Sequence, residues 1–589
     1  MIRFLRSFSA ATFAISAAAA SAQPLDGPPN ILLVLLDDAG YMDFGAYGGD
    51  TATPNIDALA DRGTKFSRFY MSPQCGPSRG MLLTGRDNHE IGLGSITETL
   101  PPDMKSLPAY SMKLADDQPT IASRLRDAGY QTFVTGKWGV GDIGANLPHR
   151  YGFDRSFVID ATGGSNYDHT SYLPLYDETY WYEDGERVTL PENFYSSEGI
   201  VDKMIDYLGE ADPDRPFFSY VSFQAIHVPI QVSPEFRDRY DGRFDQGWEV
   251  MREERLERAI SMGLVPESTR LAPLPETSRD WDDLAPQDKA YWARMMQVNA
   301  GMLEAADHHL GRLLAHLEAS GKLENTIVIV TSDNGPESAV LANREGIAGL
   351  LVDHYWMGRE GWEVDYETLG GRNSLAAIGE EWASVSAAPF ALFKFTATEG
   401  GMRVPLIMAG PGVEQVDIQP GRAHVFDIAP TLLEAAGLDP DKSNIRGRSL
   451  VPVISGDAAT VYGADDAIGF EVSGNAALYR GNWKISLIPE PLGDGKWHLY
   501  DLANDAGETT DLAMVHPALL QDMLNEYRSY ASEVGVVDMA TDFNPVKQLS
   551  RNAFTKTAKE NWLLLALFGV ALLAVVFLVG RAFRRPRRA

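Results

Sequence analysis

The run Asn30-Ile-Leu-Leu-Val-Leu-Leu-Asp37-Asp38 decides the fold of this 589-residue chain. The segment Asn30–Leu36 is short, apolar and bounded by Pro29 and Asp37, which is typical of a strand buried on both faces of a sheet. Asp37 and Asp38 then lie at the carboxyl end of that strand. Because ligands of open α/β sheets gather outside the carboxyl ends of the strands, we expect a functional site beside these two aspartates.

Helical and strand patterns alternate over the first 440 residues. The apolar spacing predicts strands at 131–135, 217–222, 326–331 and 405–409, and helices at 121–128, 200–208, 290–320 and 428–436. This alternation implies a large mixed, mainly parallel sheet flanked by helices, so the expected fold class is α/β. Short strands at 477–480, 483–487 and 497–501 then indicate a smaller C-terminal antiparallel sheet with a helix.

Length and composition limit the class of protein. The chain is 44% hydrophobic and longer than one core normally supports, so we expect two unequal domains. Its formal net charge of −30 argues against a nucleic-acid partner, because such a field repels polyanions, although a local positive pocket can still bind one anionic group. The single cysteine, Cys75, excludes an intramolecular disulfide.

Domain boundaries follow from the same patterns. We expect a larger α/β domain over residues 23–440 and a C-terminal α+β subdomain over residues 441–540. Residues 335–390 show no clean periodicity and contain aromatic residues such as Tyr355 and Trp356. This stretch is predicted to be an insertion near the site, since long loops are commonly lids or disordered segments.

Both ends of the chain carry targeting signals. Residues 1–22 combine a positive start, the apolar run Phe8–Ala20 and a small-residue cleavage site, which is typical of a signal peptide. Residues 562–580 contain no charge and would span about 28 Å as a helix, which predicts a transmembrane segment. The basic tail 581–589 should remain cytoplasmic, with residues 541–561 as a polar stalk. The chain is therefore expected to be exported and anchored on the periplasmic or extracytoplasmic face of the cytoplasmic membrane.

Polar side chains follow two of the predicted strands directly. Asp37 and Asp38 follow the first strand, and Asp333 and Asn334 follow the strand at 326–331. Either pair alone could be a helix cap or a turn. If the two strands are parallel neighbours, however, they supply an oxygen-only ligand set, which suits Ca²⁺ or Mg²⁺ and not zinc.

Twelve residues surround the only cysteine: Cys75-Gly-Pro-Ser-Arg-Gly-Met-Leu-Leu-Thr-Gly-Arg86. A Cys-x-Pro-Ser-Arg run followed by Leu-Thr-Gly-Arg resembles the signature of the sulfatase family, whereas a lone cysteine is more often a small buried hydrophobe. Other segments that look like landmarks of this family occur in the expected order along the chain: Thr53–Asp57, Gly136–Trp138, Gln224–Pro229, Glu399–Pro405, Arg446–Ser449 and Leu499–Leu502. The similarity covers about residues 29–535 and is greatest to bacterial arylsulfatases of the alkaline phosphatase superfamily.

This resemblance implies a modified nucleophile and a bound metal. Cys75 would be oxidised to formylglycine by a formylglycine-generating enzyme and hydrated to a diol that attacks sulfur. The metal ligands would be Asp37, Asp38, Cys75, Asp333 and Asn334, with Ca²⁺ favoured over Mg²⁺. Residue 75 should also lie near the positive end of a helix, where an anionic oxygen is favoured.

The resemblance also assigns roles to four cationic residues. Lys137, His227 and Lys394 match family segments and would stabilise the charge that moves onto the leaving oxygen. His227 and Lys394 are the candidates for protonating that oxygen as a general acid. Arg79 would hold the diol and the neighbouring carboxylates.

One position departs from the family pattern. The family has a histidine after Gly-Lys-Trp, where this chain has Gly139. In related sulfatases that histidine is thought to remove a proton when sulfate is expelled. Three explanations stay open: another base such as His169 or His89 enters the space, turnover is slow with a trapped intermediate, or activity is lost. We expect an initial burst followed by reduced turnover.

The predicted function is the hydrolysis of a small-molecule sulfate ester to an alcohol and inorganic sulfate. A phosphonate monoester or phosphodiester hydrolase is one alternative, because such enzymes can use the same modified cysteine and metal. A noncatalytic binding protein is another, and Gly139 is its best support. Specificity is expected to reside in residues 335–390 and in the aromatic stretch Tyr180-Trp-Tyr182.

Overall fold

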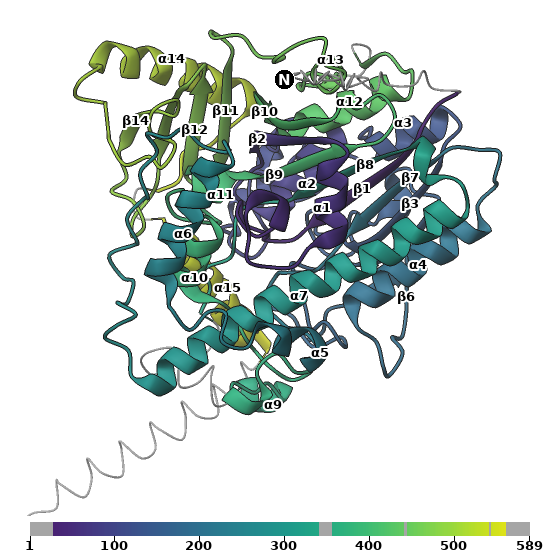
Figure 1. Cartoon of the computed structure of the whole chain (residues 1–589), viewed down its shortest axis with the longest axis horizontal. Helices are drawn as coiled ribbons and strands as arrows, with labels where there is room; N and C mark the ends of the chain where they lie inside the picture. The colour runs from purple at the N-terminus through teal and green to yellow at the C-terminus, as the bar shows by residue number, and fades with distance from the viewer. Residues whose placement is uncertain (1–26, 341–355, 441–443, 541–542, 561–589) are drawn as a thin grey trace, which may run out of the picture.

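A computed structural model describes residues 27–340, 356–440, 444–540 and 543–560 of the chain (Figure 1). Within these residues a large sheet has the strand order β10-β2-β9-β8-β1-β7-β3-β4-β5-β6. Its strands are β1 (Asn30–Leu36), β2 (Thr64–Tyr70), β3 (Gln131–Lys137), β4 (Arg155–Ile159), β5 (Trp181–Glu183), β6 (Glu186–Arg187), β7 (Phe217–Ser222), β8 (Thr326–Ser332), β9 (Arg403–Ala409) and β10 (Val416–His424).

The centre of the large sheet is parallel. Strand β1 pairs in parallel with β7 on one side and β8 on the other, and β7, β3 and β4 continue in the same direction. Strand β9 runs antiparallel between β2 and β8, so the sheet is mixed. The predicted fold class is confirmed.

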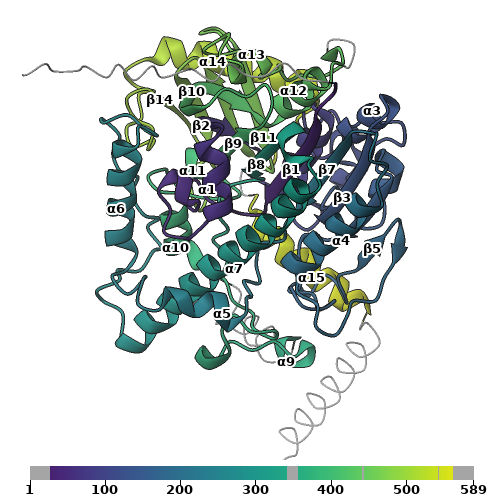
Figure 2. The ribbon, with the colours of Figure 1, turned by 45° about the vertical axis from the view of Figure 1, so that its right-hand side comes forward.

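Strand β1 is buried on both faces, as its apolar run predicted. Leu32, Val34 and Leu36 point into one hydrophobic core, while Ile31, Leu33 and Leu35 point into the other. Helices α1 (Pro54–Asp61), α4 (Ser196–Glu210) and α7 (Pro286–Ala319) supply apolar residues to the first core. The second core is shared with α2 (Cys75–Thr84), α3 (Ile121–Asp127) and α12 (Ile428–Ala435). The sheet thus lies between two layers of helices (Figure 2).

Local sequence signals explain several element boundaries. Helix α3 begins after Thr120, whose side chain forms a reciprocal capping box with Ser123. Helix α7 begins at Pro286. Proline has no backbone N–H, but the first N–H groups of a helix have no intrahelical partner, so the helix loses no hydrogen bond at this position. Helix α2 ends at Gly85, which adopts the left-handed conformation favoured by glycine.

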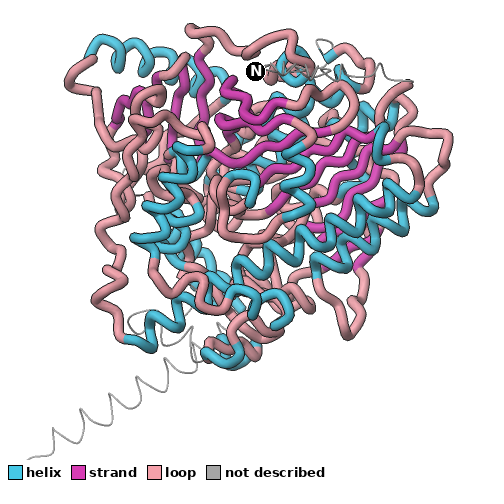
Figure 3. Tube along the Cα trace, viewed as in Figure 1, coloured by secondary structure: helices cyan, strands magenta, loops and turns pink. Residues whose placement is uncertain are grey.

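A smaller antiparallel sheet follows the large one. Its strands are β11 (Ala467–Val472), β12 (Asn475–Arg480), β13 (Trp483–Leu487) and β14 (Trp497–Asp501), each paired with the next. Helix α14 (Pro517–Val534) packs on this sheet, with Met523 buried against Leu478 and Ile485. Figure 3 shows this sheet standing beside the large one. The C-terminal sheet and helix were predicted from sequence, whereas β11 was not.

Most of the remaining helices lie at the ends of the sheets and in the long connections. They are α5 (Pro234–Arg237), α6 (Trp248–Ser261), α9 (Met357–Glu360), α10 (Gly379–Ser386), α11 (Glu399–Met402) and α13 (Val451–Ile454). Trp382 of α10 is fully buried, with ring centroids 5.7 Å from Trp248 and 5.9 Å from Trp281. This end of the stretch predicted as an insertion is therefore part of the core, because it supplies a large apolar side chain.

The segment expected to be a polar stalk contains helix α15 (Pro545–Glu560). Leu549 packs on a small apolar cluster that includes Trp356 and Tyr172, and Lys556 forms an ion pair with Asp177 at 2.9 Å. The predicted signal peptide and the predicted transmembrane segment lie outside the described residues. Among the residues that the structure describes, no helix combines the length and the apolar character needed to cross a bilayer.

Candidate active site

The site lies where β1 and β8 end. Leu36 pairs with Ser332 in the parallel register, so the residues that follow the two strands meet at the same edge of the sheet. Asp38 donates its backbone N–H to Asp333 Oδ1 at 3.2 Å. Asp38 also adopts a left-handed backbone conformation with φ 66°, so the chain turns sharply after the strand. The structure therefore confirms that the pairs Asp37-Asp38 and Asp333-Asn334 meet at one edge of the sheet.

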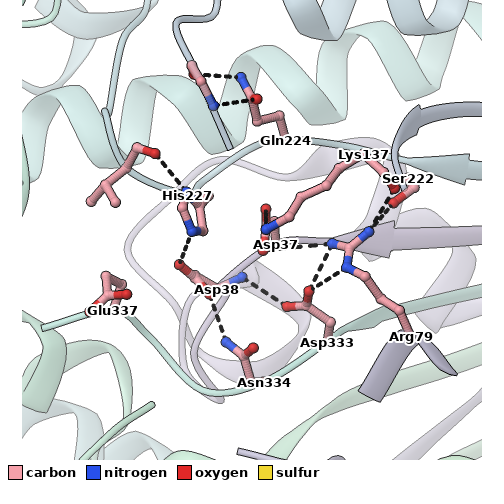
Figure 4. A network of polar contacts seen from close by, with 12 residues as sticks. Asp37, Asp38, Arg79, Lys137, Ser222, Gln224, His227, Asp333, Asn334 and Glu337 are labelled. Atoms are coloured by element: carbon pink, nitrogen blue, oxygen red, sulfur yellow. Dashed lines mark hydrogen bonds and ion pairs between the residues drawn. The ribbon is translucent and has the colours of Figure 1, made fainter. Parts of the chain in front are cut away.

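Lys137 and Arg79 neutralise the two innermost carboxylates (Figure 4). Lys137 Nζ donates to Asp37 Oδ2 at 2.6 Å, and Arg79 binds Asp333 Oδ2 through Nε at 2.9 Å and Nη2 at 2.7 Å. Arg79 Nη1 also donates to Ser222 Oγ at 2.6 Å. All of these side chains are buried, so their orientations are fixed by mutual contacts in a low-dielectric setting.

A glycine sets the position of Lys137. Gly136 has φ 106°, and a Cβ added to it would lie 1.8 Å from the backbone oxygen of Ser222. Only glycine therefore allows β3 to approach β7 this closely. The close approach carries Lys137 at the end of β3 to the carboxylates at the end of β1.

Asp38 is the second charged centre of the site. Lys394 Nζ lies 2.8 Å from Asp38 Oδ1 and 3.2 Å from Glu337 Oε2. Asn334 Nδ2 donates to Asp38 Oδ1 at 2.7 Å. Although burial opposes a charged amine, Asp38 and Glu337 raise the pKa of Lys394 well above its ordinary value. Lys394 is therefore a protonated cation.

His227 approaches the same carboxylate from the other side. Its Nε2 lies 3.8 Å from Asp38 Oδ2, and its Nδ1 lies 2.6 Å from the carbonyl oxygen of Val228. Because a carbonyl oxygen only accepts hydrogen bonds, Nδ1 carries the proton and Nε2 keeps its lone pair in the neutral ring. Burial, together with the positive charges of Lys137 and Lys394, lowers the pKa of His227 well below its ordinary value. The ring is neutral.

Cys75 occupies the first turn of α2 and faces this cluster. The preceding residue, Gln74, is extended, so the helix begins at the cysteine itself, which is only 3% exposed. Burial raises the pKa of the Cys75 thiol, whereas the charges of Lys137 and Lys394 oppose that rise. The side chain at position 75 is thus near the positive end of a helix and within the field of two ammonium groups.

The donor set at this edge suits a hard cation. Asp37 Oδ1 and Asn334 Oδ1 are buried oxygens without a hydrogen-bond partner. One donor atom each from Asp37, Asp38 and His227 lie within 4.8 Å of one another. Burial raises the pKa of Asp37 well above its ordinary value, and the nearby carboxylates of Asp333 and Asp38 add to this rise. Lys137 opposes the rise but does not cancel it. A divalent cation would relieve this repulsion and satisfy the free oxygens.

The structure brings together the nine residues that the sequence predicted for catalysis and metal binding, whereas Trp181 and Tyr182 of the stretch expected to confer specificity are buried in the two cores. It adds Glu337, which contacts Lys394, and Ser222, which contacts Arg79. Glu337 lies three residues after Asn334 in the sequence. This short separation from the predicted metal ligands was the one sequence signal that could have placed Glu337 in the site. Gln224 is also present, but its amide is bonded to Gly164, with both hydrogen bonds at 3.0 Å.

Two histidines considered as substitutes at Gly139 have other roles. Both ring nitrogens of His89 are engaged, with Asp87 Oδ1 at 3.2 Å and with Glu471 Oε2 at 2.7 Å. His169 Nδ1 lies 2.9 Å from the carbonyl oxygen of Thr179. At Gly139 itself an added Cβ would lie 3.4 Å from Arg79 Cδ and Lys137 Cε, so a side chain there would point at the charged cluster.

A second, open cavity lies apart from this cluster. It has a volume of about 970 Å³ and is lined by residues of α7 and α10, including Tyr291, Trp292 and Glu381. Ser338 also lines it, next to Glu337 in sequence, but none of the charged residues around Asp37 does. Cavity size therefore does not identify the reactive centre, whereas the buried charges do.

The sequence matches one known family over most of its length. Residues 29–438 match the profile of the Sulfatase family. An uncharacterised sulfatase of Schizosaccharomyces pombe is 34% identical over 537 residues, which cover 87% of this chain and 95% of the relative. An arylsulfatase of Klebsiella aerogenes is 33% identical over 433 residues, covering 72% of this chain and 90% of the relative.

Solved structures share the fold at lower sequence identity. The structure of Ps i-CgsB in complex with k-i-k-neocarrahexaose superposes with a TM-score of 0.61 at 23% identity, covering 90% of this chain and 99% of that chain. A second structure, in complex with its substrate D-glucosamine-2-N,6-O-disulfate, gives a TM-score of 0.57 at 20% identity and covers 86% of this chain and 98% of that chain.

Proposed function

The chain belongs to the sulfatase family, whose members hydrolyse sulfuric esters, and we propose that it cleaves small-molecule sulfate esters at the cluster around Cys75. The observation that carries this proposal is the position of Cys75 in the first turn of α2, within the field of Lys137 and Lys394. An anionic ester bound there would meet fixed cations in a low-dielectric environment, where electrostatic stabilisation is strongest.

Two groups would complete the site. Formylglycine, made from Cys75 by a formylglycine-generating enzyme, would supply a hydrated oxygen nucleophile, and Ca²⁺ rather than Mg²⁺ would supply positive charge beside it. One oxygen each of Asp37 and Asn334 has no hydrogen-bond partner, which supports a cation at this edge, with Asp38 and Asp333 completing an oxygen-only set. Family membership supports both groups, because sulfatases typically depend on them.

Arg79 and Lys137 would hold the carboxylates in place during turnover. Arg79 binds Asp333 through two nitrogens, and Lys137 binds Asp37 through one. Because partners of this kind fix the orientation of metal-binding carboxylates, loss of either cation should cost affinity for the ion as well as for the ester.

Lys394 is the better of the two candidate general acids. Its ammonium group is protonated and lies beside Asp38, whereas the His227 ring is neutral with a lone pair on Nε2. A neutral ring in this tautomer has no proton to give from the nitrogen that faces the cluster. We therefore assign protonation of the departing alcohol oxygen to Lys394, and a holding role to His227.

The sequence also supports a location and a domain division for this enzyme. We propose export through the signal peptide at residues 1–22 and attachment to the cytoplasmic membrane through residues 562–580, with the enzyme on the periplasmic or extracytoplasmic side. The catalytic domain would comprise residues 23–440, and the α+β subdomain residues 441–540.

Mass spectrometry and paired substrates test the proposal. The tryptic peptide Phe69–Arg79 from the native host should carry the mass of formylglycine, and an aryl sulfate should be hydrolysed faster than an aryl phosphonate monoester. Chelation should abolish turnover and added Ca²⁺ restore it, while Cys75→Ala should be inactive as the matched control. An unmodified thiol, faster phosphonate hydrolysis, or binding of the sulfate ester without product would each refute the proposal.

A further inference from the structure

A small cavity adjoins Cys75 on the side of Gly139. Its volume is about 20 Å³, and its lining includes Gly76, Glu98, Asp160 and Thr162 in addition to these two residues. A buried water needs roughly 10–15 Å³ and two or more polar partners. The cavity is therefore large enough for one water beside residue 75.

Two carboxyl groups lie on that wall, those of Glu98 and Asp160, and the described residues that line it include no histidine. Both are buried, with 6% and 1% of their surfaces exposed. Burial raises the pKa of Glu98 although Lys137 opposes the rise, and burial raises the pKa of Asp160 to about 7 with a further contribution from Asp142. Lys137 acts on the carboxyl group of Glu98, whereas no cation of the site is among the groups that shift the pKa of Asp160.

Glu98 is held from two sides. Tyr176 donates its hydroxyl to Glu98 Oε1 at 2.5 Å. On the backbone side, Asn552 of α15 donates to the carbonyl oxygens of Glu98 at 2.9 Å and Leu100 at 3.1 Å. The Tyr176 hydroxyl occupies one of about four acceptor positions of the carboxylate, so the carboxylate remains able to accept a proton. The contacts of Asn552 hold the backbone on which the side chain stands.

We propose that Glu98 accepts the proton that residue 75 releases when sulfate is expelled. This inference rests on the proposed function. The free hydroxyl of the hydrated, sulfated residue 75 gives its proton to Glu98, directly or through one water in the cavity. Its carbonyl bond forms as the C–O bond to sulfate breaks, and the bonding pair leaves with sulfate. Water then adds to the aldehyde and restores the hydrate.

Residues around the cavity explain why this role falls to Glu98. Gly139 has no side chain, and an added Cβ there would face Arg79 and Lys137. His89 is saturated by Asp87 and Glu471 and does not line the cavity. Glu98 is buried on the cavity wall, and burial raises the pKa of its carboxyl group, which makes it a stronger base than an exposed glutamate.

The test compares Glu98→Gln with Asp160→Asn, a matched change on the same wall. Full-length enzyme with a converted residue 75 is mixed with an aryl sulfate, quenched during turnover and digested to the peptide Phe69–Arg79. Glu98→Gln should release one equivalent of phenol in a burst, lower steady-state turnover by roughly 10²-fold or more, and accumulate a sulfated peptide. Asp160→Asn should lower turnover far less and should leave the level of sulfated peptide close to that of the wild type.

Chemical rescue separates a proton-transfer role from a structural one. Formate should restore the steady-state rate of Glu98→Ala, because a small carboxylate can enter the enlarged cavity, and chloride at equal ionic strength should not. Turnover of Glu98→Gln within twofold of wild type, equal defects in both carboxyl variants, or absence of rescue would overturn the proposal. If the wild-type enzyme itself retains a thiol at position 75 and releases no phenol, the proposed function fails instead.

Discussion

Replacing His89 should remove a pH-dependent contribution to stability without affecting catalysis. His89 lies on the loop after α2, and its ring joins Asp87 of the same loop to Glu471 of β11, so it connects this loop to the small sheet. Tyr530 of α14 donates to the other oxygen of Asp87 at 2.8 Å. Burial alone would lower the pKa of His89, but its hydrogen bonds to Asp87 and Glu471 raise the pKa to about 9.

The sign and size of the effect follow from this pKa. An unfolded histidine titrates near pH 6.5, so the folded chain binds the proton more tightly, and the stabilisation is complete below that pH and lost as the pH rises through 9. A difference of about 2.5 units corresponds to about 3.4 kcal/mol in total. About 2.5 kcal/mol should remain at pH 7 and about 0.2 kcal/mol at pH 9.5.

The assay compares urea unfolding of wild type and His89→Gln, in detergent and at constant ionic strength, by tryptophan fluorescence. Between pH 7 and 9.5 the wild type should lose about 2 kcal/mol more unfolding free energy than the variant. His498 also contacts two carboxylates, Asp494 and Asp511, but its side chain is 29% exposed, so His498→Gln should change the pH dependence far less. Parallel pH curves for wild type and His89→Gln would refute the reasoning, as would loss of aryl sulfate turnover by the folded variant.

Three further predictions concern the site itself. Gly139→His should raise steady-state turnover and shrink the initial burst, because the new side chain points at the charged cluster and histidine tolerates the left-handed φ of 58°. Stopped-flow release of phenol measures both the burst and the steady-state rate. A folded variant with no gain in turnover would contradict this prediction. Ca²⁺ at 100 times its Kd should stabilise the wild type by about 2.7 kcal/mol in calorimetry and Asp38→Asn far less, so an equal shift in both would count against a cation at this edge. Lys394→Gln should slow esters with poor leaving groups by roughly 10²-fold or more and activated aryl sulfates much less, and a uniform loss across a leaving-group series would argue against a general acid.

Much of the active-site geometry was predictable because it follows from strand order. Asp37 and Asp333 each follow an apolar run, and neighbouring parallel strands must place their carboxyl ends together. The position of Cys75 at the start of a helix was likewise expected from a short motif, although the helix begins at Cys75 itself. The large sheet was harder to complete: β2 carries Lys65 and Arg68, so its alternation is obscured and its antiparallel pairing with β9 was not predicted.

Other features of the site depend on contacts between distant segments. Glu98 lies in a stretch without periodicity, and only the fold places it on the wall of the cavity beside Cys75 and in contact with Tyr176 and Asn552. The orientation of His227 is similar, because the hydrogen bond at Nδ1 and the cations nearby decide which nitrogen carries a proton. Sequence spacing contains no information on either arrangement.

The sequence by itself determined the α/β class, the sulfatase family, the acidic edge of the sheet and the candidate nucleophile, Cys75. These depend on local apolar patterns and short motifs, whose physical effects act within one strand or one helical turn. Only the tertiary structure decided which carboxyl groups share a cavity with Cys75, which histidines are neutral or saturated, and that α15 packs beside Glu98. Those properties depend on burial and on distances between residues far apart in the chain, and both are fixed only when the cores on the two faces of the sheet have formed.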